Sequence, residues 1–214
     1  MFKQSPNSRT DAEYEERRFH FPPSHIRLRS LSGIESETAW PDASILWFTG
    51  LSGAGKSAIA DRLEAALHAC GRLTYVLDGD SVRRGLCKDL GFNEEDRREN
   101  VRRVAEVAKL MADAGVVVLV CLISPFHSDR ELAKSIAGKH VFAEIHVHAP
   151  LPVAEARDPK GLYRLARHGA IRNFTGIDSP YEKPMTPDVF IDTCSSSIDE
   201  AANIVLGWLA RHLI

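Results

Sequence analysis

The sequence lacks long apolar runs, and this absence excludes a protein built on membrane-spanning helices. Such a helix needs roughly 20 consecutive apolar residues, and no stretch of the chain approaches that length. The segment from Met1 to Arg18 is polar and charged, without the apolar core of a secretion signal. We therefore expect a cytoplasmic protein with no membrane partner.

Paired cysteines and an excess of positive charge are also missing. The 4 cysteines are widely scattered, with no C-x-x-C pair and no metal-ligand spacing. We expect reduced thiols, with Cys70 and Cys121 packed in the core because both lie in apolar patterns. The formal net charge of -2 argues against a nucleic-acid partner recognised through general basicity. A local basic pocket for a small anion remains compatible with it.

Two regions differ in composition. Residues 1–44 are polar, contain proline and show no sustained periodicity, which predicts an N-terminal arm. The arm is either solvated or a specific contact in an oligomer. Residues 45–214 carry the periodic apolar pattern of one globular domain.

Strand-like and helix-like segments alternate along that domain. Apolar runs predict strands at 45–49, 73–77, 116–123, 141–147 and 189–192. Helical spacing predicts helices at 58–70, from Asn93 to Gly115, and at 198–213. The alternation predicts an α/β fold, a five-stranded parallel sheet with helices on both faces, whose ligands bind at the carboxyl ends of the strands.

A complete phosphate-binding loop (P-loop) connects the first predicted strand to the first helix. It has the form G-x-x-x-x-G-K-S and consists of Gly50, Leu51, Ser52, Gly53, Ala54, Gly55, Lys56 and Ser57. Glycines allow backbone N–H groups to surround a phosphate, and the helix N-terminus adds its positive dipole end. In such loops the lysine reaches the β- and γ-phosphates and the serine hydroxyl binds Mg²⁺. The motif predicts a bound nucleoside triphosphate together with Mg²⁺.

Two carboxylates follow the second predicted strand. Asp78 and Asp80 should lie near the phosphate loop, while the apolar third strand carries no acid at its end. One carboxylate can bind Mg²⁺ and one can accept a proton from an attacking hydroxyl. The alternative is a solvated Asp-Gly turn.

Basic side chains gather in the next segment. They are Arg83, Arg84, Arg97, Arg98, Arg102 and Arg103. Pairs four residues apart on a helix, Glu94 with Arg98 and Glu99 with Arg103, are expected on the surface. Arg97 and Asn100 share a helical face, and guanidinium groups suit sulfate or phosphate. The alternative is a solvated charged face.

A polar, basic, glycine-bearing segment lies between the fourth and fifth strands, at 156–178. Small-molecule kinases have a lid at this position, and lid closure excludes water from the reaction. Phe174 is unusual in a solvated loop, so we expect its ring to pack or to stack on a base.

Six motifs in this order resemble those of the adenylyl-sulfate kinase (APS kinase) family. Beyond the phosphate loop and Asp78-Gly79-Asp80, they lie at 91–97, 123–126, 157–163 and 173–181. The resemblance covers about residues 45–213. It implies a P-loop nucleotide-kinase fold with a lid and a homodimer. It also implies phosphorylation of the 3′-hydroxyl of adenosine 5′-phosphosulfate (APS) by ATP with Mg²⁺, in sulfate assimilation. Because the chain leaves no room for a sulfurylase domain, we expect APS to come from a separate ATP sulfurylase.

Site roles carried over by the resemblance are as follows. Asp80 is the base or the Mg²⁺-linked acid, supported by Asp78, and Arg157 lies near the ATP adenine. The substrate-binding residues are Arg83, Phe92, Arg97, Asn100, Ile123, Ser124, Lys160 and Phe174, with the two phenylalanine rings enclosing the adenine of APS. The serine at position 124 resembles one described in some members as a phosphoserine intermediate, although direct in-line transfer needs no covalent relay.

Three positions depart from the family pattern: Ala58, Ser81 and His127 stand where threonine, asparagine and arginine are usual. Two other functions stay open, a P-loop kinase of another nucleoside-like substrate and a catalytically silent paralogue that binds APS. Lys56, Asp78 and Asp80 are all present, which speaks against the silent paralogue.

Overall fold

The computed structural model describes residues 43–212. The predicted arm at 1–44 therefore lies outside the described residues, apart from its last two positions. Ser44 already belongs to the first strand, one residue earlier than expected.

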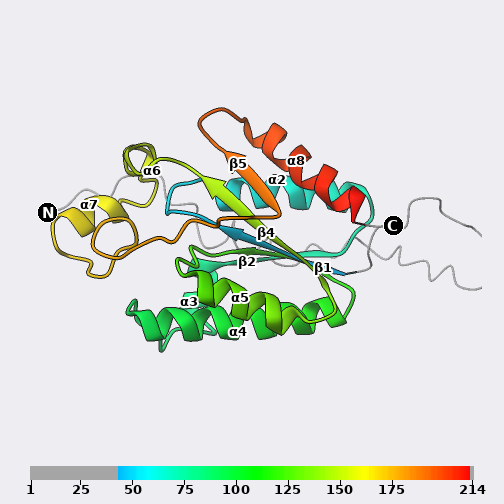
Figure 1. Ribbon diagram of the computed structural model, residues 1–214, viewed down its shortest axis with the longest axis horizontal. Coiled ribbons are helices and arrows are strands. Elements are labelled where there is room, and N and C mark those ends of the chain that lie inside the picture. The colour runs from blue at the N-terminus through cyan, green and yellow to red at the C-terminus, as the bar shows by residue number, and fades with distance from the viewer. Residues whose placement is uncertain (1–42, 213–214) are drawn as a thin grey trace, which may run out of the picture. The chain divides into compact units, whose positions relative to one another are not determined.

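Five strands form the sheet: β1 (Ser44–Thr49), β2 (Thr74–Asp78), β3 (Val117–Cys121), β4 (Val141–His148) and β5 (Val189–Asp192). Their spatial order is β2-β3-β1-β4-β5, and every neighbouring pair is parallel. The predicted five-stranded parallel sheet is confirmed. Because β1 lies at the centre, the loop that follows it opens between the carboxyl ends of β3 and β4 (Figure 1).

Helices cover both faces of this sheet. They are α2 (Lys56–Ala69), α3 (Gly79–Arg84), α4 (Glu94–Asp113), α5 (His127–Ala137), α6 (Leu151–Arg157), α7 (Leu162–Arg167) and α8 (Ile198–Arg211). Figure 1 shows α2 and α8 on one face and α4 and α5 on the other. Alternate side chains of β1 enter the two cores, Leu46 and Phe48 on the α2 side and Ile45 and Trp47 on the α4 side.

The predicted long helix is confirmed as α4. Its N-cap Asn93 accepts a hydrogen bond from the Asp96 backbone N–H at 2.8 Å, and its first turn is acidic, which complements the helix dipole. Gly115, with a φ of 86°, follows its end. The shorter helices α3, α5, α6 and α7 were not predicted, because 6 to 11 residues carry little periodicity.

The prediction for the cysteines was half right. Cys121 is buried on β3, but Cys70 is exposed because α2 ends at Ala69 and Cys70 caps it. All four thiols are free. None of the helices in the described range is long and apolar enough to cross a bilayer.

Candidate active site

The phosphate loop follows β1 and is shaped by close approach of other backbone segments. At Gly50, whose φ is 151°, a Cβ atom would lie 2.2 Å from the carbonyl oxygen of Val147. At Gly53, whose φ is 74°, it would lie 2.8 Å from the carbonyl oxygen of Ala154. No side chain fits either gap, so these two glycines are required by packing as well as by the loop conformation.

Lys56 is folded back into the loop. Its Nζ donates to the carbonyl oxygens of Gly50 and Leu51, both at 2.8 Å. Burial lowers the pKa of this ammonium to about 8, although Asp78 and Asp80 oppose the shift. A desolvated cation held by two neutral carbonyls is a strong site for a phosphate group.

Ser57 and Asp78 meet at the carboxyl edge of the sheet. The Ser57 hydroxyl donates to Asp78 Oδ2 at 2.8 Å. Asp78 is the last residue of β2 and also the N-cap of α3, since its Oδ1 accepts from the Asp80 backbone N–H at 3.0 Å. The expectation that Asp78 lies past the strand was wrong by one residue. Because Asp78 caps α3, the alternative interpretation, a solvated Asp-Gly turn, is wrong for this residue.

The pair also fits a magnesium ion. A hydroxyl and a carboxylate oxygen within hydrogen-bond distance are hard ligands, and Mg²⁺ takes one or two carboxylates plus substrate phosphates. No group of three or more His, Cys, Asp or Glu side chains suited to a metal occurs within residues 43–212. An ion bound mainly through phosphates does not need one. The structure thus places Asp78, rather than the predicted Asp80, against Ser57.

Asp80 instead pairs with the predicted lid. Its carboxylate contacts Lys160 Nζ, and both side chains are half exposed. The segment that carries Lys160 is ordered by Asp158, whose carboxylate accepts from the backbone N–H groups of Tyr163 and Arg164, each at 3.1 Å. This interaction starts α7, and sequence reasoning missed it.

The same segment contacts the phosphate loop directly. Tyr163 OH donates to the carbonyl oxygen of Ser52 at 3.0 Å, and desolvation raises the pKa of the phenol to about 12, so it stays a donor. Arg157 Nη1 reaches the carbonyl oxygen of Gly53 at 3.4 Å and Thr193 Oγ1 at 2.9 Å. Arg157 therefore lies beside the loop, and Thr193, which the sequence did not single out, orients it.

Arg97 joins two distant segments of the predicted acceptor side. Its Nε donates to the carbonyl oxygen of Phe92 at 2.8 Å, and its Nη2 donates to that of Asn173 at 2.6 Å. Arg83 and Arg97 both lie over the Phe92 ring, with their Cζ atoms 4.3 and 5.7 Å from its centroid. Desolvation lowers the pKa of both guanidinium groups below its usual value. Two partly desolvated cations on one aromatic ring favour an anionic ligand.

Asn100 and Phe174 complete this side. Asn100 is 3% exposed, and its Oδ1 has no hydrogen-bond partner among the described residues. Buried polar atoms are nearly always paired, so this one is suited to a ligand donor. Phe174 is buried and packs edge to face on Tyr163, with centroids 4.9 Å apart. Phe92 is half exposed.

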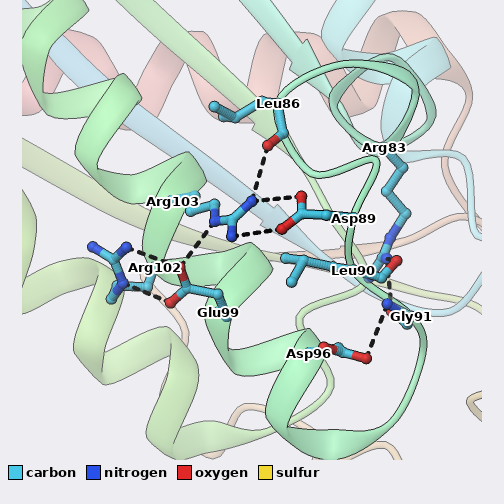
Figure 2. Close-up of polar contacts among 9 residues, drawn as sticks. All are labelled: Arg83, Leu86, Asp89, Leu90, Gly91, Asp96, Glu99, Arg102 and Arg103. Atoms are coloured by element: carbon cyan, nitrogen blue, oxygen red, sulfur yellow. Dashed lines mark hydrogen bonds and ion pairs between the residues drawn. The ribbon is translucent and has the colours of Figure 1, made fainter.

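The loop that presents Phe92 is held by a polar network (Figure 2). Arg103 donates twice to Asp89, at 2.7 and 2.8 Å, and once to Glu99 at 2.9 Å. Arg83 Nη1 donates to the Gly91 carbonyl oxygen at 2.8 Å. The Gly91 N–H donates to the Asp96 carboxylate at 2.9 Å. The predicted Glu99–Arg103 pair is confirmed.

The other predicted surface pair was wrong. Arg98 binds Asp129 of α5 at 3.1 Å instead of Glu94. Helix α5 packs beside α4 (Figure 1), so a buried carboxylate on the neighbouring helix replaces the local partner.

Ile123 and Ser124 lie beside the start of the phosphate loop. Since Phe48 pairs with Cys121 in the sheet, the residues after β3 run next to Thr49 and Gly50. Ser124 is 3% exposed and adopts a φ of 38°, in the left-handed region. His127 begins α5, where its backbone N–H donates to Glu182 at 2.7 Å.

A cavity of about 490 Å³ also borders the phosphate loop at Leu51. Its other walls come from the end of β4 and from residues 176–183. None of the predicted acceptor residues lines it. Of those residues, Arg83, Phe92 and Arg97 lie in contact with one another, and Arg97 also binds Asn173, the neighbour of Phe174.

The sheet order and the loop after β1 define a P-loop kinase. Residues 42–192 match the family model for adenylylsulphate kinase. The chain belongs to this family.

Individual relatives agree with the assignment. An adenylyl-sulfate kinase of Marinobacter nauticus is 54% identical over 171 residues, covering 79% of this chain and 86% of the relative. The APS kinase of Mycobacterium tuberculosis, solved in complex with AMPPNP and APS, has a TM-score of 0.76 at 49% identity. The match covers 79% of this chain and 98% of that one. A hexameric APS kinase from Thiobacillus denitrificans has a TM-score of 0.61 at 33% identity, covering 81% of this chain and 30% of that one.

Proposed function

We propose that this protein transfers the γ-phosphoryl group of ATP to the 3′-hydroxyl of APS, giving 3′-phosphoadenosine 5′-phosphosulfate and ADP. One observation carries the proposal: Arg97 and its neighbours are physically connected to the phosphate loop. Arg97 binds the carbonyl oxygen of Asn173, the adjacent Phe174 packs on Tyr163, and Tyr163 binds Ser52. A donor nucleotide and an anionic acceptor thus meet in one site, in a chain of the APS kinase family.

The nucleotide side holds ATP. Backbone N–H groups of residues 50–57 surround the phosphates, Lys56 exchanges its two carbonyl partners for phosphate oxygens, and Arg157 lies near the adenine. Ser57, with Asp78 or Asp80, would hold Mg²⁺. The ion, when bound, neutralises charge on the transferring phosphoryl group.

The acceptor side binds APS. Arg83 and Arg97 bind the phosphosulfate, with backbone groups of Ile123 and Ser124 beside them. Asn100 receives a ribose hydroxyl at its unpaired Oδ1. Phe92 and Phe174 enclose the adenine, and Lys160 reaches the site from the lid.

Asp80 accepts the proton of the attacking 3′-hydroxyl. In the structure its carboxylate is paired with Lys160. Binding of the substrate phosphates draws the ammonium away and leaves the carboxylate free to act as a base. Transfer is direct and in line. Ser124 Oγ is buried and accepts a hydrogen bond from Trp47 Nε1 at 3.1 Å, which does not favour it as a phosphoryl acceptor.

Release of ADP from MgATP, with and without APS, tests this function. Adenosine 5′-monophosphate serves as a control acceptor. We expect ADP that depends on APS, with the 3′-phosphorylated product identified by its mass. ADP release only with the monophosphate contradicts the proposal in favour of a nucleotide kinase. Tight APS binding without turnover contradicts it in favour of a silent binding protein.

We also propose a cytoplasmic homodimer that receives APS from a separate ATP sulfurylase. The resemblance to the family supports the homodimer. Light scattering of the purified protein measures the mass of the assembly. A hexameric mass, as in the relative from Thiobacillus denitrificans, contradicts the dimer.

A further inference from the structure

Ser124 has a backbone conformation that other residues must maintain. Among the described non-glycine residues, Ser124 and Asn173 have φ values of 38° and 57°, in the left-handed region. L-residues with a side chain disfavour this region, so such residues persist where their surroundings hold them. Both flank the acceptor side, since Arg97 binds Asn173 and the resemblance places APS against Ser124.

Hydrogen bonds from three residues of two elements, β1 and α5, hold Ser124 and its neighbour. The Ser124 carbonyl oxygen accepts from Arg130 Nη1 of α5 at 2.9 Å. Its Oγ accepts from Trp47 Nε1 of β1 at 3.1 Å. The Ile123 carbonyl oxygen accepts from Thr49 Oγ1 at 2.7 Å. The donors occupy both peptide carbonyls and the hydroxyl, which leaves the backbone little freedom to rotate.

Thr49 is itself oriented. Its hydroxyl has one proton, which goes to Ile123 because the alternative acceptor, the Ser124 carbonyl, is at 3.4 Å. Tyr181 OH, 3.0 Å from Thr49 Oγ1, must then be the donor of that pair. Desolvation raises the pKa of Tyr181 to about 12, so the phenol keeps its proton.

Burial of the charged Arg130 side chain costs free energy. Its side chain is 1% exposed, its Nε pairs with Glu144 of β4, and its Nη2 has no hydrogen-bond partner among residues 43–212. A buried ion pair is weak evidence for stability, because apolar residues of similar volume often serve as well. A charged group retained at such a site needs another reason.

We infer that Arg130, fixed by Glu144, is a positioning residue that holds the Ile123–Ser124 backbone in the shape that binds the acceptor. The planar guanidinium suits this task, because it bonds Glu144 and the Ser124 carbonyl at the same time in a fixed geometry. The inference rests on the proposed function, in which this backbone contacts APS. It assigns Arg130 to acceptor binding and not to ATP binding.

Steady-state kinetics of Arg130→Lys test the inference. Lysine keeps the charge opposite Glu144 but cannot bridge both partners. We expect the KM for APS to rise about tenfold, as for loss of a charge-assisted hydrogen bond, with the KM for ATP within about twofold. Arg98→Lys is the matched control, since Arg98 binds Asp129 of the same helix and does not contact Ser124. We expect it to leave both KM values unchanged.

A second variant covers the case in which Arg130→Lys fails to fold. Trp47→Phe keeps an aromatic ring beside Phe142 but removes the donor to Ser124 Oγ. We expect the KM for APS to rise about fivefold, again without a matching rise for ATP. Equal changes in both KM values, or no change for APS, overturn the positioning role. Wild-type protein that releases no ADP with APS contradicts the proposed function instead, so the two failures are distinguishable.

Discussion

The nucleotide side of the site is contained in one continuous motif, residues 50–57, whereas the acceptor side draws on α3, α4, the end of β3 and the segment between β4 and β5. The phosphate loop depends mainly on its own glycines and on the strand and helix that flank it. The acceptor side depends on single side chains that join distant segments, as Arg97 joins Phe92 to Asn173.

This difference teaches how specificity is built on a shared fold. A continuous loop binds the phosphates common to all nucleoside triphosphates, so it can be carried unchanged between kinases. An acceptor site assembled from long-range contacts can change its specificity when any one of those contacts is altered. We therefore expect substitutions on the acceptor side to change the KM for APS and not that for ATP. Substitutions at the junction, which is the point near Asp80 where the two sides meet, should change turnover.

The largest effect is expected at the junction, in Asp80→Asn. Asparagine cannot accept the proton of the attacking hydroxyl, so turnover should fall by about 10³-fold. Binding of an ATP analogue should survive, because the phosphate loop is untouched. Stopped-flow or coupled assays give the turnover and calorimetry gives the affinity. Asp199→Asn, an exposed site on α8, is the control. Wild-type turnover in Asp80→Asn would contradict the role of Asp80 as the base.

A substitution on the acceptor side should separate the two substrates. In Arg97→Lys, the bonds to both carbonyl oxygens cannot be made at once, and the KM for APS should rise about 30-fold. The KM for ATP should stay within about twofold. Arg98→Lys, at the next position of α4, controls for the lost guanidinium. Equal rises in the KM values for APS and ATP would mean that the acceptor side and the nucleotide side are not independent.

The pH dependence of nucleotide binding tests whether Lys56 of the phosphate loop must be protonated to bind phosphates. Burial lowers the pKa of Lys56 to about 8. Above that pH the lysine is neutral and must take up a proton when phosphates bind. The dissociation constant for an ATP analogue should thus rise about tenfold per pH unit above 8.

Lys56→Arg is the control for this titration, because arginine remains charged across the range. Its affinity should be lower overall but independent of pH between about 8 and 9.5. Calorimetry at three pH values in excess Mg²⁺ measures both proteins. A wild-type affinity that is equally flat would contradict the assignment to Lys56.

The smallest effect is expected in the supporting network of Figure 2. Arg103→Lys removes the pair of hydrogen bonds to Asp89 on the surface, which should lower the free energy of unfolding only slightly. Thermal denaturation measures this change. The KM for APS should rise less than in Arg97→Lys, because Arg83 and Asp96 still hold Gly91. A larger rise would make this loop a principal part of the acceptor side.

Local patterns were sufficient for much of the fold. The phosphate loop, the Asn93 cap of α4 and all five strands were predicted, because each depends on neighbouring residues or on an apolar run. The short helices were missed for want of periodicity, and Cys70 was misplaced at a helix end. The site roles carried over from the family remain predictions.

What the sequence determined by itself is therefore the chemistry that lies within a few residues: the phosphate loop, the strands and the long helix. The tertiary structure alone decided the strand order, the bond between Ser57 and Asp78, and the partner of Arg98. It also decided the burial of Arg130 against Glu144. The physical reason is that a charged or polar side chain takes the partner that packing brings to it, and local sequence does not specify that packing.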